Sequence, residues 1–119
     1  MVREYVPVLG FTPLVRTSGP VDSAAGPALG SQVLAVLREA LSNVARHAEA
    51  DAAVVELEVT GNDLVVRVTD NGTGLPAERR ESGLRNVRRR ATELGGTVRF
   101  LAEEPHGTRL EWTAPLGPG

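Results

Sequence analysis

The sequence predicts an α+β fold in which helices pack on one face of a mixed, mostly antiparallel sheet. In two segments, apolar residues recur at steps of three and four, which is typical of amphipathic helices. In other segments, apolar and polar residues alternate, which is typical of half-buried strands. The elements follow one another as strand, helix, hairpin, helix, hairpin. We therefore expect a two-layer sandwich formed by a single domain over residues 1–119.

Composition excludes several functional classes. A formal net charge of −2 gives no basic field for nucleic acid, and aromatic residues at 3% disfavour a base-stacking platform. The absence of cysteine excludes disulfides, thiolate zinc sites and cysteine nucleophiles. No apolar run approaches the roughly 20 residues that span a bilayer, and the first residues lack a signal-peptide pattern. We expect a cytoplasmic protein that contacts neither nucleic acid nor membrane.

The first third of the chain predicts a strand, a loop and a long helix. Residues 1–11 resemble no compact element and are interpreted as the tail of an inter-domain linker. A strand is expected at residues 12–17, where Pro13 would confine it to a sheet edge. Residues 18–30 are rich in Gly, Ala, Pro and Ser, which predicts a loop. The helical period then covers residues 33–48.

Polar side chains lie along one edge of this helix, beside its apolar stripe. At about 100° per residue they fall within a narrow arc. They are Glu39, Asn43, Arg46 and His47. A half-buried carboxylate or amide without a partner costs roughly 1–3 kcal/mol, and a bound ligand or metal would supply such partners. A surface helix whose long side chains extend past the core edge would explain the pattern equally well.

The rest of the chain predicts a hairpin, a second helix and a second hairpin. The Thr60-Gly61-Asn62-Asp63 segment is typical of a tight turn between two strands. Gly95-Gly96 offers a stop for the second helix. The expected strands cover residues 55–59, 64–69, 98–100 and 108–114, and the expected helix covers residues 84–94.

A glycine motif, Asp70-Asn71-Gly72-Thr73-Gly74, follows the second strand of the first hairpin. A hairpin turn would explain Asn71-Gly72 alone, but residues 75–82 show no alternation and contain a proline. Glycines spaced by one residue let the backbone approach a flat ligand closely. Asp70, at the strand end, can accept a hydrogen bond from an exocyclic amine.

The second helix opens with Ser82-Gly83-Leu84. A helix start gathers free amide groups and the positive end of the helix dipole, so it can bind an anion. A cap by Ser82 followed by a solvated arginine face is the alternative. Gly83 favours the anion site, because glycine in a first turn lowers helix propensity without local benefit.

Thr108 follows Gly107 at the start of the last expected strand. Thr108, Leu110 and Trp112 are alternate residues of one strand and therefore face the same side. The hydroxyl group of Thr108 is thus expected on the apolar side of that strand. Such a threonine is either satisfied by the backbone or able to bind a base through water.

Together these motifs resemble the ATP-binding domain of sensor histidine kinases, within the superfamily of gyrase, Hsp90-type chaperones and MutL. The resemblance runs from about Leu29 to Pro115 and implies a Bergerat-type ATP-binding fold. Residues 37–48 are especially similar to the nitrate-sensor class, and to actinobacterial redox and oxygen sensors with haem-binding GAF domains. The matching motifs are Glu39-x-x-x-Asn43-x-x-Arg46-His47, Asp70-x-Gly72-x-Gly74, Ser82-Gly83-Leu84-x-Asn86 and Gly107-Thr108.

The resemblance implies a role for each of these residues, with ATP and Mg²⁺ as cofactors. Asn43 would hold Mg²⁺ through its side-chain oxygen, and Glu39 would orient or deprotonate the attacking group or a metal-bound water. Asp70 would accept a hydrogen bond from the adenine amino group. Residues 75–82 would form a short ATP lid. The remaining nucleotide contacts would come from Arg46, His47, Gly72, Gly74, Leu75, Gly83, Leu84 and Thr108.

The resemblance also implies partners. The chain has two histidines, His47 and His106, and neither lies in a segment that resembles a phosphoacceptor helix. The phosphorylated histidine is therefore expected on a separate dimerisation and phosphoacceptor domain, which would pass the phosphoryl group to a response regulator. We expect the isolated domain to be a monomer and the full-length kinase a homodimer. The alternatives are an anti-sigma-factor-type serine kinase and a non-catalytic interaction module of the same fold.

Overall fold

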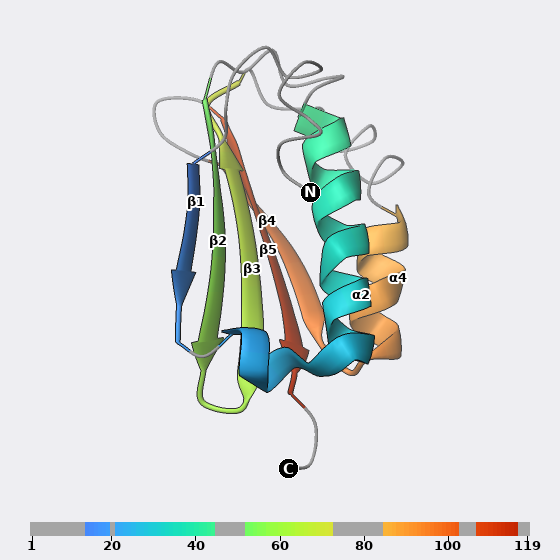
Figure 1. Cartoon of the computed structure of the whole chain (residues 1–119). Coiled ribbons are helices and arrows are strands. Elements are labelled where there is room, and N and C mark those ends of the chain that lie inside the picture. Colours follow the sequence, from blue (N-terminus) through green and yellow to red (C-terminus); the bar gives the residue numbers. More distant parts are fainter. Residues whose placement is uncertain (1–13, 20, 45–51, 73–84, 103–106, 117–119) are drawn as a thin grey trace.

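The computed structural model describes a five-stranded sheet with helices on one of its faces (Figure 1). The order of the strands in the sheet is β1-β2-β3-β5-β4. β1 pairs with β2 in parallel and all other neighbours pair antiparallel, which confirms the mixed, mostly antiparallel sheet. The described residues are 14–19, 21–44, 52–72, 85–102 and 107–116. The strands are β1 (Leu14–Ser18), β2 (Ala53–Thr60), β3 (Asp63–Asp70), β4 (Thr97–Ala102) and β5 (Thr108–Pro115).

The hairpin of β2 and β3 forms where the sequence predicts it. Thr60 pairs with Asp63, and Gly61 in the turn has a φ of 60°. That backbone conformation favours glycine and matches the twist of the two strands. β1 is an edge strand, also as predicted, and all of its residues are exposed.

Helix α2 (Val21–Asn43) begins earlier than the sequence predicts, so the expectation of a loop through residue 30 is wrong. The alanines in this stretch are strong helix formers and compensate for its glycines. Pro27 lacks a backbone N–H, which weakens a helix locally and causes bends. Figure 1 shows the first turns of α2 running in a different direction from its long second part. Residues 45–51 lie outside the described residues, so the expected continuation to residue 48 stays a prediction.

Helix α4 (Arg85–Glu93) ends at the predicted glycines. The N–H of Gly96 donates to the carbonyl oxygen of Ala91 at 2.7 Å, and that of Gly95 donates to Thr92 at 3.1 Å. Gly95 has a φ of 77°. These features define a helix end closed by a left-handed glycine.

The hydrophobic core lies between the helices and the sheet face that they cover. Alternate residues of the central strands point into it, because successive side chains of a strand face opposite sides. The largest fully buried side chains are Trp112, Leu41, Leu64, Val36, Val55, Val66 and Val87. In the described part of the chain, no helix is both long and apolar enough to cross a membrane.

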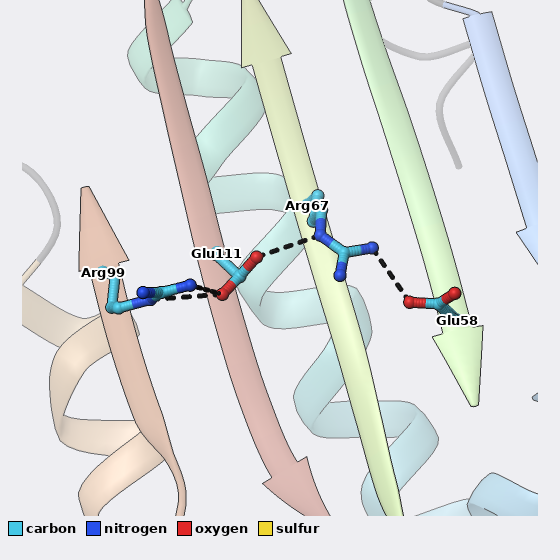
Figure 2. Close-up of polar contacts among 4 residues, drawn as sticks. All are labelled: Glu58, Arg67, Arg99 and Glu111. Atoms are coloured by element: carbon cyan, nitrogen blue, oxygen red, sulfur yellow. Dashed lines mark hydrogen bonds and ion pairs between the residues drawn. The ribbon is translucent and has the colours of Figure 1, made fainter. Parts of the chain in front are cut away.

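The opposite face of the sheet carries charges of alternating sign. Strand register places Arg16, Glu56, Arg67, Glu111 and Arg99 in one row across the sheet. Arg67 donates to Glu111 at 3.0 Å and to Glu58 at 3.1 Å, and Arg99 Nε donates to Glu111 at 3.2 Å (Figure 2). These bonds connect β2, β3, β5 and β4 on the face without helices, so this network stabilises the sheet.

Candidate functional site

Several chain segments with predicted site residues end at the same end of the molecule, the top of Figure 1. α2 and β3 finish there and β5 begins there, and the first turn of α4 is the end of that helix nearer to it. This arrangement brings the last residue of α2, Asn43, to the same end as Asp70 and Thr108. In the strand register Asp70 lies directly opposite Thr108. The described site residues therefore gather at one end of the two-layer sandwich.

Asp70 is the buried polar residue of this end, with 7% of its surface exposed. Its Oδ1 accepts a hydrogen bond from the N–H of Gly72 at 2.9 Å, and its carboxylate also accepts one from the N–H of Thr108. Burial raises the pKa of Asp70, because a buried carboxylate loses hydration, and the two backbone N–H groups oppose that rise. The backbone N–H groups of Gly72 and Thr108 thus compensate the charged form of the Asp70 carboxyl group only in part.

The turn after Asp70 is held by Asn71, a role that the sequence reasoning missed. The side-chain oxygen of Asn71 accepts a hydrogen bond from the N–H of Ala52 at 3.0 Å. Its own N–H donates to the carbonyl oxygen of Ala52 at 3.2 Å. Asparagine commonly stabilises turns in this way, which is the signal that could have identified it. The bonds fix the end of β3 to the start of β2, and so fix the backbone that carries Gly72.

Gly107 packs against the backbone of Asp70. A Cβ atom at Gly107 would lie 2.1 Å from the carbonyl oxygen of Asp70, and the φ of Gly107 is 125°. Both facts require glycine here. Thr108, which follows, is half-buried and lies on the side of β5 that carries Leu110 and Trp112, as predicted. Gly107 therefore lets the start of β5 lie close to the end of β3, so that the N–H of Thr108 can donate to the carboxylate of Asp70.

The helix side of the site is described in part. Glu39 is half-buried on α2 and lies one turn before Asn43, whose side chain is outside the described set. Among the described residues, no group of three or more His, Cys, Asp or Glu could hold a metal ion.

The other predicted site residues lie outside the described residues, and their roles stay predictions. The lid at residues 75–82 belongs to this group. The individual residues are Arg46, His47, Gly74, Leu75, Gly83 and Leu84.

The start of α4 carries an unusual charge distribution. Its first turn holds no acidic residue, and Arg85 and Arg88 stand at this end. Positive side chains near a helix N-terminus are unfavourable by about 0.3–1 kcal/mol each, since the helix dipole is positive there. A bound polyanion would reverse that effect. Arg88 also lies over the Phe100 ring, 5.7 Å from its centroid.

Comparison with solved structures agrees with this fold. The chain superposes on a structure of the Acinetobacter baumannii histidine kinase AdeS with a TM-score of 0.74. That match covers 98% of this chain and 59% of the other, at 14% identity. The ATP binding domain of PrrB from Mycobacterium tuberculosis gives a TM-score of 0.67 at 22% identity and covers 89% of this chain and 82% of the other.

Sequence comparison identifies the family. The model of the histidine kinase-, DNA gyrase B-, and HSP90-like ATPase family matches residues 29–118. The chain is 32% identical to the sensor histidine kinase LiaS of Bacillus subtilis, over 82% of this chain and 28% of LiaS. It is 37% identical to the sensor protein VraS of Staphylococcus aureus, over 68% of this chain and 24% of VraS. The chain thus spans about a quarter of the length of each of these relatives. It belongs to the histidine kinase-, DNA gyrase B- and HSP90-like ATPase family and corresponds to the ATPase domain of sensor histidine kinases.

Proposed function

We propose that this chain is the Mg-ATP-binding catalytic domain of a two-component sensor histidine kinase. The observation that carries the proposal is the buried carboxyl group of Asp70 at this end of the sandwich. An ionised carboxylate offers about four acceptor positions, and two backbone N–H groups use part of them. The amino group of adenine is a donor that would fill a further position and offset the cost of burial.

The phosphates and the metal would lie toward the helices. Asn43 offers an amide oxygen, which is a hard ligand suited to Mg²⁺, and Glu39 lies one turn earlier to orient the attacking group. When bound, Mg²⁺ neutralises charge on the phosphates. The arginines at the start of α4 supply positive charge on the same side. Further contacts are assigned to Arg46, His47, Gly72, Gly74, Leu75, Gly83, Leu84 and Thr108, with residues 75–82 as a lid.

The γ-phosphoryl group is transferred to a histidine on a separate dimerisation and phosphoacceptor domain, and then to a response regulator. This part of the proposal is supported by the names of the relatives, LiaS and VraS, of which the chain spans about a quarter. The relatives favour a histidine kinase over a serine kinase of the same superfamily. The isolated domain is expected to be a monomer, and the complete kinase a homodimer.

A finer assignment is to the nitrate-sensor class, and within it to actinobacterial sensors with haem-binding GAF domains. Glu39 stands where many histidine kinases have asparagine, and the segment at residues 75–82 is short and has no phenylalanine. Both features support that class.

Titration calorimetry of the chain with Mg-ATP tests the nucleotide site. We expect binding by the wild-type chain and loss of binding in Asp70→Ala, because the acceptor of the adenine amino group is gone. Asp63→Ala is a matched control, since Asp63 is an exposed carboxylate at the opposite end of β3. Unchanged affinity in Asp70→Ala would contradict the proposed adenine contact.

Phosphoryl transfer from labelled ATP to the protein's own phosphoacceptor domain tests the reaction. A phosphohistidine product is labile in acid and stable in base. An acid-stable product on a partner protein would instead identify a serine kinase.

A further inference from the structure

The single tryptophan of the chain connects the sheet to helix α4. Trp112 on β5 is completely buried, and its indole N–H donates to the main-chain oxygen of Val87 at 3.1 Å. Val87 is the third residue of α4. The bond therefore joins the central part of β5 to the first turn of the helix.

Helix α4 depends on such contacts for its position. It has nine residues, whereas isolated helices shorter than about 12–15 residues are marginal in water. Its buried side chains are Val87 and Ala91. At its other end, Arg90 Nη1 donates to the side-chain oxygen of Gln32 on α2 at 2.7 Å. In addition to this apolar packing, one polar bond thus connects α4 to β5 near its start, and one connects it to α2 further along the helix.

β5 carries both the anchor of α4 and a wall of the proposed adenine site. Thr108 lies opposite Asp70, and Trp112 lies four residues further along the same side of the strand, about 14 Å away. The first turn of α4 holds Arg85 and Arg88, whose positive charge is assigned above to the side of the phosphates. The same rigid strand therefore relates the adenine contact to the helix that carries this charge.

We propose that Trp112 is a positioning residue for the phosphate part of bound ATP, an inference that rests on the proposed function. Because it is completely buried, Trp112 acts through Val87 and not by touching nucleotide. The adenine contact of Asp70 is held by Gly72 and Thr108 and does not involve α4. Loss of the indole N–H should therefore weaken binding of ATP and leave binding of adenosine nearly unchanged.

The test compares Mg-ATP and adenosine in calorimetric titrations of the wild-type chain and Trp112→Phe. We expect affinity for Mg-ATP to fall about fivefold, the effect of one neutral hydrogen bond, with little change for adenosine. Leu64→Val is the control, since Leu64 is a buried core residue beside the β2–β3 turn. It should leave the ratio of the two affinities unchanged. Equal losses for both ligands in Trp112→Phe would overturn the inference.

A second measurement needs no substitution. One tryptophan gives one indole N–H signal in a ¹⁵N-correlated spectrum, and its hydrogen-exchange rate reports on the bond to Val87. Mg-ATP should slow this exchange and adenosine should not; equal effects, or none from Mg-ATP, would overturn the inference.

A wild-type chain that binds neither ligand would contradict the proposed function itself, and the inference with it. Binding of Mg-ATP without these differences would contradict the inference alone.

Discussion

Substitution of Gly107 by alanine should damage the site through the backbone alone. The added Cβ would lie 2.1 Å from the carbonyl oxygen of Asp70, where ordinary contacts are 3.4–4 Å, so β5 must move away from β3. The unfavourable φ of 125° costs about 1–3 kcal/mol in alanine. Losing the hydrogen bond from the N–H of Thr108 to the carboxylate costs about 1.5–3 kcal/mol more. We expect a total loss of about 3–5 kcal/mol in the free energy of unfolding.

Gly61→Ala is the matched control for this substitution. Gly61 has a positive φ of 60° but an added Cβ there would meet nothing within 4 Å, and it lies in the turn at the other end of β3. Its substitution should cost about 1–2 kcal/mol from backbone strain alone. Thermal unfolding should then place the melting temperature of Gly107→Ala roughly 10 °C below that of Gly61→Ala. Calorimetry should show loss of Mg-ATP binding in Gly107→Ala only. Equal melting temperatures and equal affinities in the two variants would refute the reasoning.

Three further predictions concern stability and pH. Asp70 has a raised pKa in the folded state, so its contribution to stability is present below its unfolded pKa and lost as pH rises through the folded value. Asp70→Asn should therefore flatten the decline of unfolding free energy that urea titrations show between the unfolded and the folded pKa of Asp70; an unchanged pH profile would contradict the assignment. Glu111 has a lowered pKa, chiefly through Arg99, so its contribution is lost as pH falls through the folded value. Glu111→Gln should cost about 1 kcal/mol at pH 7 and little in acid, and a loss independent of pH would argue against the ion pairs. Gln32→Ala should cost about 1 kcal/mol by removing the partner of Arg90, measured by urea unfolding, and no loss would show that this bond adds no stability.

Part of the fold and site could be predicted because the relevant signals are local. The β2–β3 turn, the end of α4 at Gly95 and the place of Asp70 at a strand end are all encoded by neighbouring residues. The start of α2 could not be predicted from local signals, because its first residues include alanine, which favours a helix, and glycine, which disfavours one.

The sequence by itself determined the order of the elements, the faces of the strands and the residue types that can bind an amine or an anion. These follow from periodicity and side-chain chemistry, which do not depend on distant contacts. Only the tertiary structure decided which distant residues meet. It placed Gly107 against the backbone of Asp70, and the indole of Trp112 against Val87. Residues far apart in the chain are brought together by strand pairing and helix packing, and spacing along the sequence carries no record of such pairs.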